Sequence, residues 1–272
     1  MIVRQIPSTK ETIPVVGLGT WQSFDADPSS DLEPLKKVLS TMNAAGARLI
    51  DSSPMYGRSE EIIGLLTQND ANNSFFYATK VWTRGKDDGI RQMENSFQKM
   101  KRSVIDLMQI HNLVDWKIHF ATLQKWKEEG KVRYIGITHY MDYMHRQLAD
   151  IIRSEKIDFV QFNYSIANRH GEEFLLKTAA DNGVAVLINR PFGEGNLFNM
   201  VKGKTLPQWS SEYGIESWSQ FFLKFIISHP TVTCVIPATS SPKHAEDNMK
   251  AGLEPLPGEA IRKKMIAFMK EL

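Results

Sequence analysis

Short apolar segments alternate with longer amphipathic segments through nearly the whole of this 272-residue chain. The apolar segments are rich in Val, Ile and Phe, as expected of strands that are buried on both faces of a parallel sheet. Eight strand–helix alternations predict an α/β protein, and eight is the number of parallel strands that closes a (β/α)8 TIM barrel. We predict the strands at residues 15–20, 48–51, 75–80, 105–110, 132–138, 159–163, 184–188 and 233–236.

The segments between these strands carry helix signals, such as the terminating glycines Gly46 and Gly130. A chain of this length is ordinary for one barrel, so we expect residues 1–272 to form a single domain. We predict helices at residues 32–45, 60–66, 90–101, 117–129, 144–154, 172–181, 216–229 and 242–250, with an additional C-terminal helix at 259–272.

Polar residues stand at the ends of three successive predicted strands. Asp51 ends the second strand, Lys80 ends the third, His111 follows the fourth, and Tyr56 lies just beyond Asp51. Taken singly, Asp51 is explained as a helix cap, Tyr56 as loop packing, Lys80 as a solvated strand end and His111 as a loop histidine. In parallel α/β folds, however, the carboxyl ends of the strands form one face where chemistry is done. Four such groups on one face indicate an active site.

Motifs that support this interpretation occur in a fixed order along the chain. They are residues 17–21 (Gly-Leu-Gly-Thr-Trp), 50–57 (Ile-Asp-Ser-Ser-Pro-Met-Tyr-Gly), 79–82 (Thr-Lys-Val-Trp), 106–111 (Asp-Leu-Met-Gln-Ile-His), 134–138 (Tyr-Ile-Gly-Ile-Thr), 161–164 (Gln-Phe-Asn-Tyr) and 236–242 (Ile-Pro-Ala-Thr-Ser-Ser-Pro). Together they resemble the aldo-keto reductase family, in its bacterial type with short substrate loops. The resemblance implies an oxidoreductase that transfers hydride from NADPH, or alternatively NADH, to the carbonyl of an aldehyde or ketone.

The four polar residues suit that reaction, because the carbonyl oxygen gains negative charge and needs a proton donor and hydrogen-bond donors. The resemblance implies that Tyr56 donates the proton and that His111 orients the carbonyl through a hydrogen bond. We expect the Lys80 ammonium to lower the pKa of Tyr56 from its ordinary value of about 10. Asp51 is expected to pair with Lys80 and keep it charged.

The resemblance also implies a cofactor site across the carboxyl face of the barrel. No Gly-x-Gly-x-x-Gly motif follows a predicted strand, so a Rossmann site is not supported. Thr138 and Gln161 would bind the nicotinamide carboxamide, and residues 236–248 would hold the adenosine end. The residues expected at the cofactor are Gly19, Thr20, Trp21, Thr138, His139, Gln161, Arg190, Pro191, Phe192, Gly193, Thr239, Ser240, Lys243, Asp247 and Asn248.

The chain departs from the family pattern after the fifth and seventh strands. His139 stands where the family commonly has Asn, and an imidazole still offers one donor or acceptor there. Many members carry an aromatic residue that stacks on the nicotinamide, where this chain has Asn189. We expect the adjacent Arg190 to reach the pyrophosphate instead, since a guanidinium matches phosphate geometry.

Departures at the adenosine end bear on the choice between NADPH and NADH. Basic residues that many members use for the 2′-phosphate are replaced by Ala238 and His244. Thr239 and Ser240 are expected to bond that phosphate, and the neighbouring Lys243 to supply a positive charge. The expected preference is therefore for NADPH.

Aromatic residues at two family pocket positions, Trp21 and Trp82, are expected to line a substrate pocket together with Asn112; core packing is the alternative for both tryptophans. The short segment 112–116 and the end of the chain after its last helix predict an open pocket with broad tolerance. The long segment 191–215 is expected to be functional, since loops after strands seven and eight of this fold often bind phosphate. The alternative is a flexible surface insertion.

The resemblance implies a small-molecule carbonyl substrate as partner, and the bulk properties of the chain argue against other classes of partner. The net charge of +2 argues against a nucleic acid or a membrane as partner. No apolar stretch approaches the ~20 residues that span a bilayer, and residues 1–14 lack the apolar core of a signal peptide. We expect a cytoplasmic monomer or weak homo-oligomer, unless a leader was removed before Met1. Cys234, the single cysteine, is expected to be a buried thiol, and no metal site is predicted.

Two other functions use the same residues. An aldolase would employ Lys80 as a Schiff-base nucleophile, although the neighbouring Asp51 and Tyr56 disfavour this role. A non-catalytic NADPH-binding sensor or regulatory subunit would keep the cofactor site without turnover. The fold does not distinguish them, so the prediction of a reductase depends on the site itself.

Overall fold

The structure is a computed structural model that describes residues 1–69 and 74–272. Within these ranges, neighbouring strands pair in parallel and in sequence order to form an eight-stranded sheet. The strands are β3 (Leu18–Gly19), β4 (Leu49–Asp51), β5 (Phe76–Val81), β6 (Ile105–His111), β7 (Val132–Thr138), β8 (Phe159–Asn163), β9 (Ala185–Asn189) and β10 (Val232–Val235).

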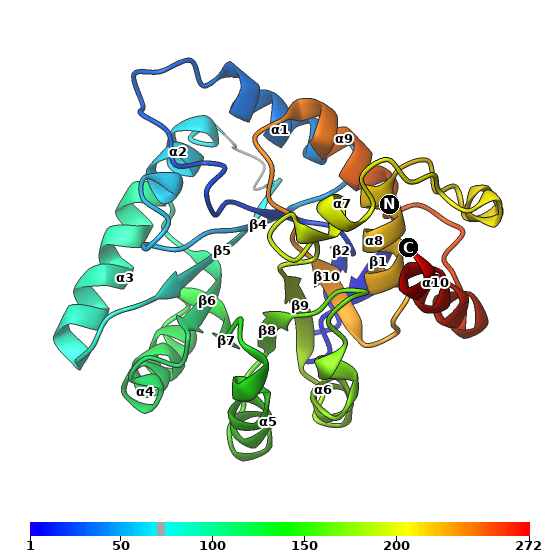
Figure 1. The fold of residues 1–272 in the computed structure, drawn as a ribbon. Coiled ribbons are helices and arrows are strands. Elements are labelled where there is room, and N and C mark those ends of the chain that lie inside the picture. Colours follow the sequence, from blue (N-terminus) through cyan, green and yellow to red (C-terminus); the bar gives the residue numbers. More distant parts are fainter. Residues whose placement is uncertain (70–73) are drawn as a thin grey trace.

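The first and last strands of this sheet meet and close it into a barrel (Figure 1). Val16 forms a parallel bridge with Val235, and Gly19 forms one with Ala238. The backbone N–H of Gly17 donates to the carbonyl of Val235 at 2.9 Å. The predicted (β/α)8 fold is therefore confirmed.

Helices surround the strands, and α1 lies beside α9 where the barrel closes (Figure 1). Among the described residues, none of the helices is both long and apolar enough to cross a bilayer. The helices are α1 (Glu33–Ala44), α2 (Ser59–Leu66), α3 (Lys86–Met100), α4 (Trp116–Glu128), α5 (His145–Ser154), α6 (Leu175–Asp181), α7 (Asn196–Met200), α8 (Trp218–Ile227), α9 (Pro242–Lys250) and the predicted additional helix α10 (Glu259–Glu271), with short 3-10 helices η1 (Asp142–Met144), η2 (His170–Glu172) and η3 (Gln208–Tyr213).

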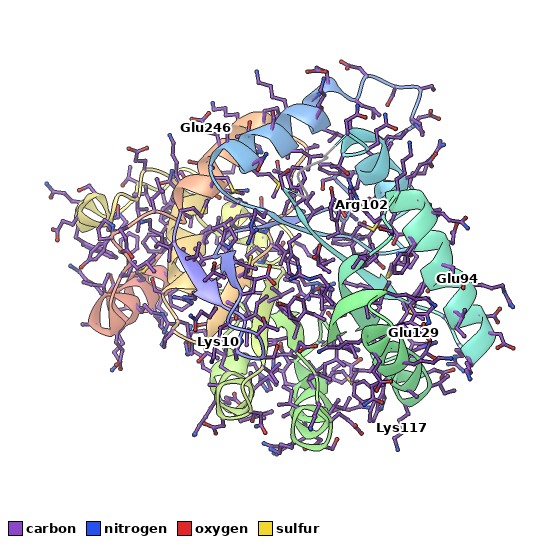
Figure 2. The ribbon with its side chains drawn as sticks, turned by 180° about the vertical axis from the view of Figure 1, so that it is seen from behind. Lys10, Glu94, Arg102, Lys117, Glu129 and Glu246 are labelled. Carbon is purple, nitrogen blue, oxygen red and sulfur yellow. The ribbon has the colours of Figure 1, made fainter. Side chains whose placement is uncertain are left out.

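The amino-terminal end of the barrel is filled by an antiparallel hairpin, β1 (Val3–Gln5) and β2 (Thr12–Pro14). Ile6 and Ile13 of this hairpin pack with buried residues at the starts of the barrel strands, such as Phe76 and Phe159. Figure 2, which views the molecule from behind, labels Lys10 in the turn of the hairpin. Because this end is filled, the carboxyl ends of the strands form the accessible face.

The predictions from the sequence did not include the hairpin, and they misplaced the ends of some strands and helices. The predicted strand at 15–20 is a regular strand only over Leu18–Gly19. On the side facing the last strand, it pairs only through isolated bridges. Helix α3 begins at Lys86, four residues before the predicted start, and includes Gly89. A Cβ on Gly89 would lie 2.4 Å from the His119 ring, so this glycine allows α3 to approach α4 closely.

The long segment after β9 contains α7 and η3 rather than continuous loop. Leu197 of α7 is buried. The ring of Phe198 lies 4.9 Å from that of Phe192 and 5.7 Å from that of Phe222 on α8, measured between centroids. The segment therefore packs on the barrel instead of standing off it as a surface insertion.

Candidate active site

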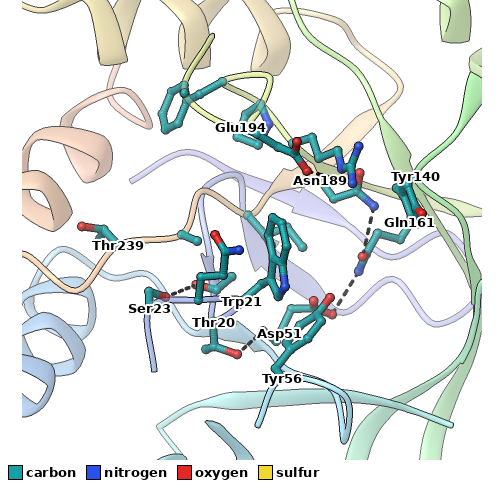
Figure 3. Close-up of a pocket in the computed structure, with 18 of the residues that line it drawn as sticks. Thr20, Trp21, Ser23, Asp51, Tyr56, Tyr140, Gln161, Asn189, Glu194 and Thr239 are labelled. Atoms are coloured by element: carbon teal, nitrogen blue, oxygen red, sulfur yellow. Dashed lines mark hydrogen bonds and ion pairs between the residues drawn. The ribbon is translucent and has the colours of Figure 1, made fainter. Parts of the chain in front are cut away.

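The four predicted polar residues come together at the carboxyl face. Asp51 ends β4, Lys80 is the penultimate residue of β5 and His111 ends β6. Lys80 Nζ donates to Asp51 Oδ2 at 2.5 Å and lies 4.9 Å from the centroid of the Tyr56 ring. The rings of Tyr56 and His111 lie edge to face at 5.9 Å. Figure 3 labels Asp51 and Tyr56 among the residues that line the pocket.

Lys80 is completely enclosed, with 0 % of its side chain exposed. Besides Asp51, its ammonium donates to the backbone carbonyl of Ser52 at 2.7 Å. Burial opposes the charge, but Asp51 and Tyr56 outweigh it and raise the pKa of Lys80 above its ordinary value. The lysine therefore stays positively charged beneath the phenol.

The other carboxylate oxygen of Asp51 accepts hydrogen bonds from two glutamine side chains. Gln109 Nε2 donates to Asp51 Oδ1 at 2.7 Å, and Gln161 Nε2 donates to the same oxygen at 3.0 Å. Gln161 Nε2 also lies 3.0 Å from Gln109 Oε1. A buried carboxylate needs such partners, because an unpaired charge in the interior is costly. The amides fix the carboxylate that in turn holds Lys80.

The pKa of Tyr56 departs from its ordinary value in the direction opposite to the one expected from the sequence. Burial of the phenol raises this pKa, and the Lys80 charge lowers it by less. The lysine thus has the predicted sign, but the expectation of a net decrease was wrong, because burial of the phenol is not visible in the sequence. Tyr56 keeps its proton at neutral pH, as a proton donor must.

His111 is neutral, since burial and the nearby Lys80 lower its pKa to about 2. Its Nδ1 lies 3.0 Å from the hydroxyl oxygen of Ser53. That oxygen accepts from the backbone N–H of Met55 at 3.3 Å, so the Ser53 proton is free to be donated to Nδ1. The second nitrogen, Nε2, then carries the His111 proton. In this tautomer the neutral ring has a hydrogen to donate, and the role of His111 toward a substrate carbonyl stays a prediction.

A cavity of about 640 Å³ opens above these residues. Its lining includes residues from the ends of many strands (Figure 3). Of the residues predicted from the sequence, those that line it are Gly19, Thr20, Trp21, Asp51, Tyr56, His111, Asn112, Thr138, Gln161, Arg190, Pro191, Phe192, Thr239 and Ser240.

The other predicted residues do not line this cavity. Asp247 accepts hydrogen bonds from Ser217 and Gln220 at the start of α8, each at 2.6 Å. Asn248 Oδ1 likewise accepts a hydrogen bond from the hydroxyl of Ser219 on α8. Both side chains therefore join α9 to α8. The remaining non-lining residues are Lys80 beneath the floor, Trp82 (whose ring centroid is 6.4 Å from that of His111), His139, Gly193 and Lys243.

His139, which stands where the family commonly has Asn, does not line the cavity. Its Nδ1 accepts from the backbone N–H of Met141 at 3.1 Å, and its ring stacks on Tyr140 at 5.4 Å. Tyr140, rather than His139, reaches the cavity wall. At the other end, His244 lines the cavity where the sequence had favoured Lys243.

Arg190 lines the cavity and is already held in place. Its guanidinium pairs with Glu194 at 2.8 Å and stacks over the Tyr140 ring at 4.0 Å. The residue has a positive φ of 50°. The neighbouring residue Asn189 donates from Nδ2 to Gln161 Oε1 at 3.3 Å. Within the described part of the chain, Asn189 Oδ1 has no hydrogen-bond partner.

Sequence reasoning missed several residues that shape the site. Gln109 precedes His111 by two positions on β6, and the two-residue period of a strand was a signal that placed both on one face. Ser53 lay inside the motif that contains Asp51 but carried no distinguishing signal. Tyr140 and Asn189 become part of the wall only through the positions of the loops after β7 and β9.

Comparison with known proteins agrees with this geometry. The family model described as "Aldo/keto reductase family" matches residues 15–264. The chain therefore belongs to the aldo/keto reductase family and is an oxidoreductase.

Similar proteins in this family come from fungi and bacteria. Aldo-keto reductase str7 of Strobilurus tenacellus is 28 % identical, covering 83 % of this chain and 78 % of that protein. NADH-specific methylglyoxal reductase of Escherichia coli is 28 % identical, covering 75 % and 72 % respectively. The crystal structure of a Klebsiella pneumoniae aldo-keto reductase in complex with NADPH superposes with a TM-score of 0.80 at 22 % identity, covering 99 % of this chain and 96 % of that one, and supports the fold.

Proposed function

We propose that this chain transfers hydride from NADPH to the carbonyl carbon of small aldehydes and ketones, with Tyr56 as proton donor. The observation that carries the proposal is the enclosed ammonium of Lys80, bonded to Asp51 and Ser52 and lying 4.9 Å from the Tyr56 ring. A fixed positive charge at this place has its largest effect when the phenol gives up its proton.

The residues around the cavity fit a dinucleotide. Helix α9 begins at the far end, where Ser241 caps it by accepting from the backbone N–H of His244. A helix N-terminus favours a phosphate group, and the hydroxyls of Thr239 and Ser240 line the cavity beside it. Arg190 also lines the cavity, and its guanidinium is suited to the pyrophosphate. Thr138 and Gln161 line the cavity next to Asp51, to which Gln161 donates, and we propose them for the carboxamide.

When bound, NADPH would supply the hydride. The chain's own residues supply everything else, and Tyr56 does so as a neutral phenol whose raised pKa keeps the proton in place until the carbonyl oxygen becomes basic. After proton donation, the phenolate lies next to Lys80, whose charge is fixed by Asp51. Little reorganisation is needed, so the charge arrangement stabilises the transition state more than the ground state.

His111 has a separate role in this proposal. With Nδ1 engaged by Ser53, its Nε2–H is available to the carbonyl oxygen. Its lowered pKa, about 2, keeps the ring from competing with Tyr56 as the acid. The result is one proton donor and one orienting donor, with separate tasks.

For the cofactor, we propose NADPH with NADH as a weaker alternative. A solved neighbour holds NADPH, whereas a curated relative is described as NADH-specific. In this chain, Thr239, Ser240 and His244 line the adenosine end of the cavity. Among the residues that the structure describes, no cation is enclosed there in the way that Lys80 is enclosed at the catalytic end, so a modest preference for NADPH is expected.

The aldolase alternative is weakened by the state of Lys80. A Schiff-base nucleophile must be an accessible neutral amine. Lys80 is fully buried and has a raised pKa. Its ammonium donates two hydrogen bonds, one to Asp51 and one to the carbonyl of Ser52. The sensor alternative is compatible with the same geometry and is separated from the reductase only by turnover.

The decisive experiment measures oxidation of NADPH and NADH with a panel of small aldehydes, for the wild type and for Tyr56→Phe. We expect turnover with NADPH that falls by at least ~100-fold in Tyr56→Phe, as for loss of a general acid. Unchanged NADPH binding by the variant is the control for folding. NADPH binding without turnover of any carbonyl by the wild type would favour the sensor, and turnover that survives in Tyr56→Phe would remove Tyr56 as the donor.

A further inference from the structure

A second cluster of ligating side chains lies outside the cavity, on the segments that follow β7 and β8. It consists of Asp142 in η1, His145 at the start of α5 and His170 in η2. One ligand atom from each of these residues lies within 4.8 Å of the others. His145 is fully buried, whereas Asp142 and His170 are partly exposed. Nothing in the proposed reaction uses these three side chains.

Hydrogen bonds around the cluster fix the protonation of His145. Asn163 Nδ2 donates to Asp142 Oδ1, which leaves Asn163 Oδ1 as an acceptor facing His145 Nε2 at 3.0 Å. The hydrogen of His145 is therefore on Nε2, and its Nδ1 carries an unprotonated lone pair. Metal-ligating histidines are commonly oriented by such a bond from the other ring nitrogen.

Asp142 is oriented by a second amide. Asn168 Nδ2 donates to both carboxylate oxygens of Asp142, each at 3.0 Å. The carboxylate keeps further lone pairs beyond those that accept from Asn163 and Asn168. A side chain held in this way is a prepared ligand rather than a freely moving surface acid.

The lone pair of His145 Nδ1 faces another ring nitrogen. His170 Nδ1 lies 3.0 Å away, and the two lone pairs repel unless a positive centre lies between them. That centre is either one proton on His170 or a metal ion. A proton accounts for the contact between the two imidazoles alone, whereas the Asp142 carboxylate, already oriented by Asn163 and Asn168, brings a third ligand atom within 4.8 Å of a nitrogen of each ring. Three ligand atoms converging from three elements favour the metal.

We propose that Asp142, His145 and His170 form a binding site for Zn²⁺, with a carboxylate oxygen and the two Nδ1 atoms as ligands. Imidazole nitrogen and carboxylate oxygen are ordinary zinc ligands, and three protein ligands leave a fourth position for water. Zinc–nitrogen bonds of about 2.0 Å separate two ligand nitrogens by roughly 3.3 Å in a tetrahedron, so the imidazoles need to part by only a few tenths of an ångström.

The surroundings allow an ion to enter and be held. A surface hollow lined by Arg169, His170, Glu172 and Glu173 lies at the exposed side of the cluster. Glu173 Oε2 lies 3.6 Å from His170 Nε2 and is an acceptor for that nitrogen once Nδ1 is a ligand. The bound ion would join the segments after β7 and β8, which are separate in sequence.

The test uses the full chain, treated with a chelator and then titrated with ZnCl₂ alone by calorimetry, and with CoCl₂ by visible absorption. We expect one Zn²⁺ per chain and Co²⁺ bands of tetrahedral intensity. His170→Ala should abolish both, and Asn163→Ala should weaken Zn²⁺ binding by roughly 10- to 100-fold, as for loss of a supporting partner. His244→Ala, which removes an exposed histidine elsewhere, should bind like the wild type.

His170→Gln provides a second variant, because it keeps a polar side chain at a partly exposed position and so tests ligation separately from folding. Circular dichroism confirms that each variant is folded, and retained NADPH binding confirms it for the His170 and Asn163 variants, which lie outside the cavity lining. The proposal is overturned if the wild type shows no stoichiometric binding at micromolar Zn²⁺. It is equally overturned if folded His170→Ala and His170→Gln bind Zn²⁺ as tightly as the wild type.

Discussion

The hydroxyl oxygen of Ser53 lies 3.0 Å from Nδ1 of His111. This oxygen accepts from the Met55 backbone, which leaves the Ser53 proton available, and we propose that the serine donates it to the imidazole and sets the tautomer. On this proposal, Ser53 is a positioning residue, which acts on the substrate oxygen only through His111.

Ser53→Ala is therefore expected to lower kcat with carbonyl substrates by about 10-fold, comparable to the loss of one hydrogen bond. NADPH affinity should be unchanged. ¹⁵N NMR of His111 should report a mixture of tautomers in place of one. Ser52→Ala is the matched control, since the Ser52 hydroxyl bonds Thr20 instead. An unchanged tautomer in Ser53→Ala would remove this role for the serine.

His111 should also make the fold sensitive to acid. Its pKa is about 2 in the folded chain against an ordinary 6.5, so between these values the unfolded chain binds the proton and the folded chain does not. Stability contributed by neutral His111 is complete above pH 6.5 and is lost as the pH falls, by up to about 1.4 kcal/mol per pH unit.

Urea unfolding at pH 7, 6 and 5 measures this effect, with His111→Gln as the comparison. The variant should lose less stability on acidification than the wild type. His229, whose pKa burial lowers to about 4, adds a similar dependence to both proteins and does not affect the difference. Parallel pH profiles of the two proteins would contradict the prediction.

Removing the positive end of the buried ion pair should be costly. Lys80→Met leaves Asp51 charged and buried without its ammonium partner, and we expect a loss of about 3 kcal/mol in the free energy of unfolding along with the loss of turnover. The double variant Asp51→Asn/Lys80→Met should recover part of this stability, because the remaining groups are neutral. Urea unfolding of the three proteins tests the coupling, and equal stability of Lys80→Met and wild type would refute it.

Arg190 gives a test of cofactor binding that is separate from chemistry. If Arg190 binds the pyrophosphate, Arg190→Ala should weaken NADPH binding by roughly 10- to 100-fold, as for a hydrogen bond to a charged group. Glu194→Gln should leave affinity unchanged or raise it, because Glu194 pairs with Arg190 at 2.8 Å and competes with phosphate. Fluorescence titration measures both. Unchanged affinity in Arg190→Ala would end this assignment.

The arrangement of Asp51, Lys80 and His111 was predictable because parallel strands in register carry their ends to one face. Asp51 pairs with Ala78, two residues before Lys80, and His111 pairs with Thr138. Strand periodicity and motif spacing indicate which residues lie at the carboxyl ends of the strands. The (β/α)8 fold follows from the same alternation.

Other features depend on contacts that a linear pattern does not contain. Asp247 faces α8 because Ser217 lies opposite it, 30 positions earlier in the chain. The raised pKa of Tyr56 depends on how deeply the phenol is enclosed. The hairpin at the base of the barrel was missed because its strands have only three residues each.

The closure of the barrel has a consequence for how the protein is made. The wall around Gly19 is completed by Ala238, and Thr239 to Ser241 of the cavity lining follow directly. A nascent chain that has not yet released this segment from the ribosome lacks one side of the cavity, however much of the preceding sequence has folded. We therefore expect ligand capture to follow the pairing of Val16 and Gly19 with Val235 and Ala238, because the cavity is incomplete before that pairing forms.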